Sequence, residues 1–166
     1  MPSHKTPTEM LKEDHQHVLQ KLDALEDITH HLDKKGEVAE KLKELAAFFK
    51  TEFWVHFTKE EDALFPEIDK FIPRESGPIG VMMIEHEDLR GTNSRLQPAI
   101  AAYLRDSDNA EARGVIQKDG AHFVELLRNH IDKEDNILFM IADMHLDQTQ
   151  IDKVAKLFAS IEKTGG

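Results

Sequence analysis

The sequence predicts an all-α protein, an antiparallel up-down-up-down four-helix bundle with an additional short C-terminal helix. Apolar residues recur at three- and four-residue spacing over four long stretches of the 166-residue chain, a pattern typical of helices that bury one face. The connections between these stretches are about 5 to 10 residues long, which favours antiparallel neighbours. The sequence lacks the two-residue alternation that would predict strands.

The first two helices are predicted from their apolar stripes and their ends. The first opens at Pro7–Thr8 and ends after a basic turn before Gly36, which we expect to cap it. The second runs from about Glu37 to about Phe71, and Pro66 is expected to bend it or mark its final turns. The inward residues expected on these two helices are Leu11, His15, Val18, Leu22, Leu25 and Thr29, and Val38, Leu42, Leu45, Phe49, His56, Glu60 and Leu64.

The third and fourth helices follow the densest turn chemistry in the chain, a loop over residues 72–80 with two prolines and two glycines. The third helix starts after this loop and continues through Pro98 with a kink. A turn at 106–109 leads to the fourth helix, from about Ala110 to Met144. The inward residues expected here are Ile79, Met82, Met83, His86, Leu89, Asn93, Leu96, Ile100 and Tyr103, and Val115, Asp119, Phe123, Leu126, His130, Glu134, Ile137 and Ile141.

A last apolar stripe predicts an amphipathic C-terminal helix that covers one end or flank of the bundle. Its apolar residues are Ile151, Val154, Leu157, Phe158 and Ile161. The length of the chain suits one domain. We therefore expect a flexible N-terminus over residues 1–7, the bundle over 8–145, and the C-terminal helix packing on the bundle over 146–166.

Composition and charge limit the possible functions. Hydrophobic residues make up 40% of the chain and no apolar run approaches the roughly 18 residues of a membrane span, so no membrane insertion is expected. The N-terminus lacks the apolar core of a secretory signal and the chain has no cysteine, so a cytoplasmic location is expected. The net charge of -11 argues against a nucleic-acid partner. Neither a phosphate-binding glycine loop nor a nucleophile elbow occurs.

One motif occurs twice, a histidine followed four residues later by a glutamate. The copies are His56–Glu60 and His130–Glu134. On a helix this spacing corresponds to about 40° of rotation, so both side chains project from one face. Imidazoles and carboxylates suit iron, manganese or zinc, and a carboxylate can bridge two ions. The repeated motif therefore predicts a two-metal centre.

The apolar stripes place six ligand-type side chains inside the bundle, at least one from each long helix. They are His15, His56, Glu60, His86, His130 and Glu134. Burying a carboxylate without a compensating charge costs several kcal/mol or forces its protonation. A fully hydrogen-bonded core network without metal is the alternative, and it would have to be repeated on two helices. We expect these six residues to ligate metal.

The other polar residues near the motifs are assigned differently. His122 lies about 80° from His130 around the helix, at the margin of the stripe, where it could be an extra ligand. The acidic neighbours Glu61, Asp62 and Asp135 are expected to face water. Surface roles are expected for His4, His17, His30 and His31, and packing roles for Phe48, Phe49, Phe53, Trp54, Phe57, Phe65, Phe123 and Phe139.

Taken in order, these motifs resemble the hemerythrin-like (HHE cation-binding) family. The pattern is a histidine on helix one, HxxxE on helix two, a histidine on helix three and HxxxE on helix four, over about residues 8 to 145. The resemblance implies a non-haem di-iron site in a four-helix bundle. It implies that Glu60 and Glu134 bridge two irons, with manganese or zinc as conceivable substitutes. It also implies that the irons are capped by His15, His56, His86 and His130.

Two departures from the oxygen-carrying hemerythrins matter. Those proteins add a histidine four residues after the one on helix three, where this chain has Arg90, and they end with an aspartate where this chain has Glu134. Fewer imidazoles leave more coordination positions open or filled by water. The resemblance therefore favours reactivity with peroxide, nitric oxide or oxygen over simple oxygen storage.

The leading functional hypothesis is a di-iron protein that binds oxygen, nitric oxide or peroxide for sensing, storage or detoxification. A peroxidase-like, catalase-like or nitric-oxide-handling enzyme is one alternative, separated from a carrier by multiple turnovers of peroxide. An iron-responsive interaction module, in which iron occupancy sets the stability of the bundle, is another. The sequence does not determine whether turnover occurs or whether the protein self-associates.

Overall fold

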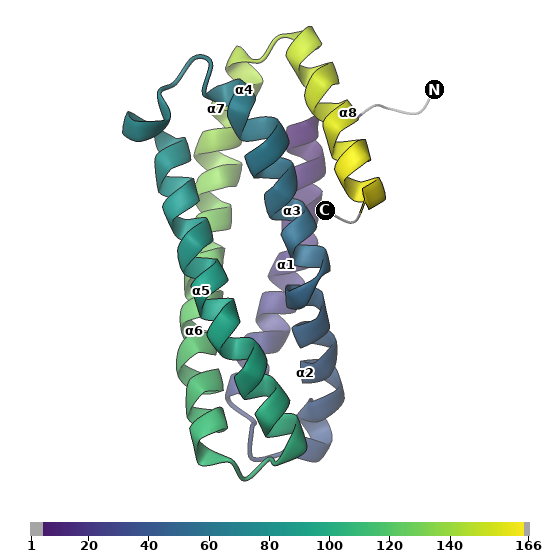
Figure 1. Cartoon of the computed structure of the whole chain (residues 1–166), viewed down its shortest axis with the longest axis vertical. Helices are drawn as coiled ribbons and strands as arrows, with labels where there is room; N and C mark the ends of the chain where they lie inside the picture. The colour runs from purple at the N-terminus through teal and green to yellow at the C-terminus, as the bar shows by residue number, and fades with distance from the viewer. Residues whose placement is uncertain (1–4, 165–166) are drawn as a thin grey trace.

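The computed structural model describes residues 5–164 and has four antiparallel helical rods (Figure 1). Its helices are α1 (Pro7–Thr29), α2 (Lys35–Lys50), α3 (Glu52–Lys59), η1 (Glu60–Leu64), α4 (Phe65–Ile68), η2 (Arg74–Ser76), α5 (Pro78–Arg105), α6 (Ala110–Lys133), η3 (Glu134–Leu138), α7 (Phe139–His145) and α8 (Gln148–Thr164). The second rod is α2–α3–η1–α4 and the fourth is α6–η3–α7. No strand occurs among residues 5–164. The predicted all-α bundle with a C-terminal helix is confirmed.

The first rod begins with a capping box. The Thr6 side chain accepts from the backbone N–H of Glu9, and the Glu9 side chain accepts from that of Thr6, which satisfies two of the unpaired donors at the helix start. The prediction that Gly36 caps this helix was wrong, because α1 ends at Thr29 and Gly36 lies inside α2. The Tyr103 hydroxyl instead fixes the connection by donating to the Leu32 carbonyl.

The second rod is interrupted where one continuous helix was predicted. Thr51 leaves helical geometry, with φ -125° and ψ -78°, and its hydroxyl donates to the Ala47 carbonyl. Such bonding to the carbonyl four residues back bends helices. Past α3, a π-helical turn begins at Glu60, where the Phe65 N–H reaches five residues back to the Glu60 carbonyl. Pro66 follows in the final helical turn, one of its two expected positions.

The third rod starts earlier than predicted, at Pro78, inside the expected loop. A Cβ built on Gly80 would lie 2.6 Å from the Arg74 carbonyl oxygen, so only glycine lets α5 approach the preceding turn this closely. Pro98 lies within α5, which continues beyond it to Arg105.

The fourth rod shows the largest error in the predicted stripe. Ile137 was predicted to point inward but is 51% exposed, whereas Leu138 is buried. The cause is a second π-helical turn that begins at Glu134, in which the Phe139 N–H donates to the Glu134 carbonyl. A turn that closes over five residues instead of four moves every later side chain around the axis. Periodicity at 3.6 residues cannot anticipate this change.

The core consists of two apolar clusters, and on every rod one ligand-type residue lies between them. On α1, His15 lies between Leu11 of one cluster and Val18 of the other. On α5, His86 lies between Met82 and Leu89 in the same way. A polar layer therefore separates the two apolar clusters.

The C-terminal helix α8 packs against α1, α3 and η1 (Figure 1). Its Val154 and Phe158 are fully buried in the cluster that also contains Leu11 and Leu64. Of the predicted flexible N-terminus 1–7, residues 1–4 lie outside the described part, as do residues 165–166 of the predicted segment 146–166. Within the described chain, no helix has the length and hydrophobicity to cross a membrane.

Candidate metal centre

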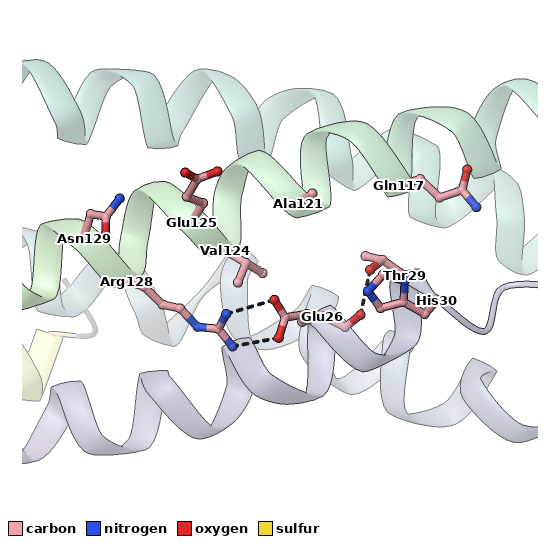
Figure 2. A pocket seen from close by; sticks show the side chains of 9 residues that line it. All are labelled: Glu26, Thr29, His30, Gln117, Ala121, Val124, Glu125, Arg128 and Asn129. Carbon is pink, nitrogen blue, oxygen red and sulfur yellow. Dashed lines mark hydrogen bonds and ion pairs between the residues drawn. The ribbon is translucent and has the colours of Figure 1, made fainter.

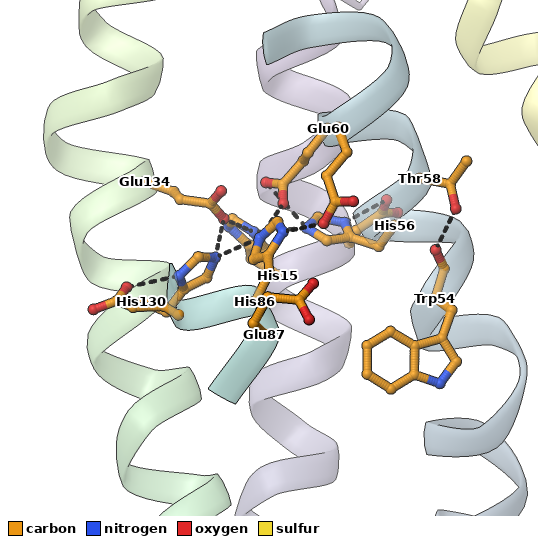
Figure 3. A network of polar contacts seen from close by, with 12 residues as sticks. His15, Trp54, His56, Thr58, Glu60, His86, Glu87, His130 and Glu134 are labelled. Atoms are coloured by element: carbon orange, nitrogen blue, oxygen red, sulfur yellow. Dashed lines mark hydrogen bonds and ion pairs between the residues drawn. The ribbon is translucent and has the colours of Figure 1, made fainter. Parts of the chain in front are cut away.

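The six side chains that were predicted to point inward as metal ligands meet in the middle of the bundle (Figure 3). They come from α1, α3, η1, α5, α6 and η3, and each is at most 6% exposed. The set is His15, His56, Glu60, His86, His130 and Glu134. The arrangement is thus a buried, all-protein cluster of four imidazoles and two carboxylates.

These residues form two overlapping groups of four that share both carboxylates. One group contains His15 and His56, the other His86 and His130, and each also contains Glu60 and Glu134. Within each group, the potential ligand atoms lie within 4.8 Å of one another. Each group can therefore surround one ion, and the two glutamates are placed where carboxylates could bridge both.

The two groups have nearly the same internal distances. The Nε2 atoms are 3.1 Å apart in each histidine pair. The first histidine of each pair approaches the glutamate of the opposite motif, with Nε2–Oε1 distances of 3.1 Å for His15–Glu134 and 3.2 Å for His86–Glu60. The second approaches the glutamate four residues later in its own motif, at 3.4 Å in both cases. The centre thus has an approximate two-fold relation between α1–α3 and α5–α6.

Each of the four imidazoles is held from outside by a further carboxylate on a different rod. The Nδ1 atoms lie 2.7 Å from Asp135 for His15, 3.2 Å from Asp14 for His56, 2.6 Å from Glu61 for His86 and 2.9 Å from Glu85 for His130. Such partners fix the orientation of metal-ligating histidines and raise their basicity. This role was not predicted from the sequence, because Glu61 and Asp135 were expected to face water and no role was expected for Asp14 and Glu85. The available signal was position: each of the four is next in sequence to a cluster residue.

The outer carboxylates determine which way the ring protons point. A carboxylate accepts, so each Nδ1 carries the proton and donates it, and the Nε2 lone pair of the neutral ring then faces the centre. All four oxygens of Glu60 and Glu134 are buried without accepting a hydrogen bond of normal geometry. Lone pairs and unpartnered anionic oxygens that converge in a dry core are strongly unfavourable unless cations lie between them. The donor set therefore fits divalent metal ions.

The pKa values show how the cluster would balance its charge with protons alone. Burial, together with the negative charge of Glu134, raises the pKa of Glu60 to about 8. Burial also opposes the charged form of His130, but the charge of Glu134 outweighs it and raises the pKa of His130 to about 10. Glu134 has a pKa well below the usual value because the positive charge of His130 outweighs its burial. Without metal, the cluster retains protons near neutral pH.

Aromatic rings enclose the imidazoles and exclude water. The Phe57 ring stacks on His86 with centroids 3.7 Å apart, and Phe139 stacks on His15 at 5.5 Å. Phe65, the counterpart of Phe139 under the two-fold relation, lies 5.8 Å from His86. Low polarity around the ligands strengthens every electrostatic interaction within the cluster.

Two other features do not belong to the cluster. His122, considered above as an extra ligand, lies on the surface, where its Nε2 is 3.1 Å from Asp88 and its side chain is 47% exposed. A surface pocket of about 500 Å³ between α1 and α6 (Figure 2) is lined by none of the six residues. Arg128 spans this pocket with hydrogen bonds of 2.9 and 3.1 Å to Glu26.

The outer carboxylates lead to a testable expectation. Replacing Asp135 with asparagine should weaken metal binding about 10- to 100-fold. An amide can donate its N–H to the Nδ1 of His15, which would move the ring proton to Nε2 and change the orientation of the ring. Competition titration with a metal-sensitive chelator measures the affinity. Asp132→Asn, an exposed change three residues earlier, is the matched control and should change nothing. Equal affinities for the two variants would show that Asp135 does not position His15.

Comparison with known proteins agrees with this geometry. A family model described as the hemerythrin HHE cation binding domain matches residues 6–142. This range includes all six cluster residues and the four outer carboxylates. Comparison with curated proteins finds no match.

Proposed function

Because the chain belongs to the hemerythrin HHE cation-binding family, we propose that its centre holds two iron ions and binds a small ligand such as oxygen, nitric oxide or peroxide. The role of such binding would be sensing, storage or detoxification. The motifs in the sequence resembled those of this family, and the family match confirms the resemblance. The buried cluster fits a metal-binding protein. The identity of the metal as iron, the small ligand and the physiological role are parts of the proposal.

The observation that supports the proposal most strongly is the sharing of two unpartnered carboxylates by two histidine pairs. Glu60 and Glu134 belong to both groups, and none of their oxygens accepts a hydrogen bond of normal geometry from the described residues. Two histidines and two shared carboxylates per ion form a borderline-to-hard donor set, which suits iron. The resemblance and the geometry thus support the same ligand assignment, with four capping histidines and two bridging glutamates.

Different side chains would have different roles in such a site. The four histidines would hold the ions and the outer carboxylates would keep their rings oriented. The two glutamates would neutralise charge, and Phe57, Phe65 and Phe139 would keep the surroundings dry and restrict entry to small molecules. Bound iron would supply open coordination positions and a change of oxidation state.

Arg90 supports reactivity rather than simple oxygen carriage. It occupies the position where oxygen-carrying hemerythrins have a further histidine, and a guanidinium cannot ligate a metal. Its Nη2 atom instead lies 2.9 and 2.7 Å from the two oxygens of Glu61, the carboxylate that orients His86. The ion group of His86 and His130 therefore has no fifth protein ligand from this position, which favours an open site.

The function is tested on protein loaded with ferrous iron without oxygen. We expect about two irons per chain and, after addition of oxygen or nitric oxide, new ligand-to-metal absorption in the near-ultraviolet and visible range. Absence of such absorption in iron-replete protein would contradict the proposal. Consumption of peroxide in multiple turnovers would favour the enzyme over a carrier or sensor.

Metal binding is expected to depend on pH. The pKa of Glu60 is raised to about 8, and hydrogen bonds and nearby carboxylates overcome burial to raise the pKa values of His15 and His86 as well. Metal must displace these protons, so binding should release protons and the apparent affinity should fall as the pH falls below about 8. Calorimetry in buffers of different ionisation enthalpy measures the proton count. An affinity that is constant between about pH 6 and 8 would contradict the raised values.

A further inference from the structure

The two halves of the bundle are related by the approximate two-fold of the metal centre, but only one half is covered by a fifth helix. Under this relation α1 corresponds to α5, and α3–η1 corresponds to α6–η3. In the first half, α8 lies over α1, α3 and η1. Figure 1 shows α8 on that side of the bundle, with no counterpart beside α5 and α6 in the described chain.

The equivalent positions in the two halves differ in exposure. Lys59 is 7% exposed beneath α8, where it lies 2.5 Å from Glu162, whereas its counterpart Lys133 is 40% exposed. Ala63 is 1% exposed, whereas its counterpart Ile137 is 51% exposed. The surface that α8 covers in one half is therefore open in the other.

The open surface is unusually apolar. Five of the six large hydrophobic side chains that are exposed among the described residues belong to α5, η3 and α7, which are elements of the half that no fifth helix covers. They are Val81, Ile84, Ile137, Met140 and Met144, with exposures between 46% and 74%, and we call them the α5–α7 face. The ion pair of Glu85 with Lys133 joins α5 to α6 at the level where this face begins. Clustered apolar side chains on a surface mark interaction sites, whereas scattered ones do not.

We propose that the α5–α7 face binds an amphipathic helix of another protein, with apolar residues spaced as in α8 and a net positive charge. In α8 the apolar anchors Ile151, Val154, Phe158 and Ile161 follow a three-four-three spacing. Helices that dock in this way present such anchors to an apolar surface. Residues 148–164 carry three lysines against one aspartate and one glutamate, a net charge of +1 on a chain of -11.

Charge and size favour such a helix over a second copy of the chain. Exposed acids lie on the same rods as the face, among them Glu87, Asp88 and Asp132. Two copies, each with a net charge of -11, would repel one another. A stable dimer also needs roughly 20–30 residues from each partner, far more than five apolar side chains provide. A single helix matches the size of the face.

The probe for this proposal is a fluorescein-labelled peptide of residues 148–164, titrated with the full-length chain. We expect saturable binding by fluorescence anisotropy. The double variant Ile84→Glu/Met144→Glu should bind the peptide at least about tenfold more weakly. The matched control, Ala101→Glu/Ala121→Glu, adds the same two charges at exposed positions of the same rods and should bind as the unmodified chain does.

Three results would overturn the proposal. The first is an absence of saturable binding up to about 1 mM peptide, an affinity too weak for a specific helix site. The second is equal binding by both double variants, which would indicate that the peptide displaces α8 or binds elsewhere. The third is a concentration-dependent dimer that the α5–α7 variant abolishes, because the face would then serve a second copy. Equal melting temperatures establish that the variants are folded, and Met144→Glu alone replaces the double variant if that one unfolds.

Discussion

Replacing Glu60 with glutamine is expected to remove both metal ions, although it changes only one side chain. Glu60 belongs to both groups of ligands, so each ion loses an anionic donor and the link to the other ion. The bound metal should fall from about two ions per chain to well below one, measured by elemental analysis after desalting. In contrast, His56→Ala removes a ligand of one group only, and about one ion should remain.

The glutamine variant is chosen because it should fold. The pKa of Glu60 is raised to about 8 without metal, so the carboxyl is mostly protonated at neutral pH and glutamine resembles it in shape and charge. Glu125→Gln, an exposed change on α6, is the control and should leave the metal content unchanged. A Glu60→Gln chain that retains two ions would refute the bridging role.

Removing metal is expected to lower the melting temperature by about 15–30 °C. An ion that binds only the folded chain stabilises it by about 4 kcal/mol when its concentration is about 1,000 times the dissociation constant, and two ions contribute about twice that. For a chain of this size each kcal/mol shifts the midpoint by about 2–4 °C. Thermal unfolding followed by circular dichroism, with and without a chelator, measures the shift.

The physical reason for this shift lies in the two unpartnered glutamates. Their four oxygens are buried and accept no hydrogen bond of normal geometry from residues 5–164, so the folded chain without metal contains a strongly unfavourable layer between its apolar clusters. The Glu60→Gln variant should therefore show little or no shift with added metal. A midpoint that metal does not change in the unmodified chain would mean that the cluster is satisfied without cations.

The sequence was sufficient to predict the helical bundle and the six central residues. His15 and His86 could be placed because each falls on a regular stripe of leucines and other apolar residues, and a buried polar group there needs an explanation. The repeated HxxxE motif placed the other four. These predictions depend only on the spacing of residues along one helix, because the 3.6-residue period determines which residues share a face.

The π-helical turns and the outer carboxylates could not be predicted in the same way. The turn at Glu134 places Leu138 in the core instead of Ile137. A π-helical turn is rare, and contacts between rods, which the spacing of residues along one helix does not reveal, must offset its free-energy cost. Asp14 binds His56 rather than its neighbour His15, because adjacent side chains on a helix point in different directions and each outer carboxylate reaches another rod. Pairing between rods depends on the packed structure.

Two ions are expected to share Glu60 and Glu134 in the middle of the bundle, and the proposed function depends on this sharing. An anomalous difference map from crystals of the iron-loaded chain, recorded at the iron edge, tests it most directly. We expect two peaks, one beside His15 and His56 and one beside His86 and His130, with both glutamates between them. A single peak, or iron bound at a surface pair such as His122 and Asp88 with the cluster unchanged, would contradict it.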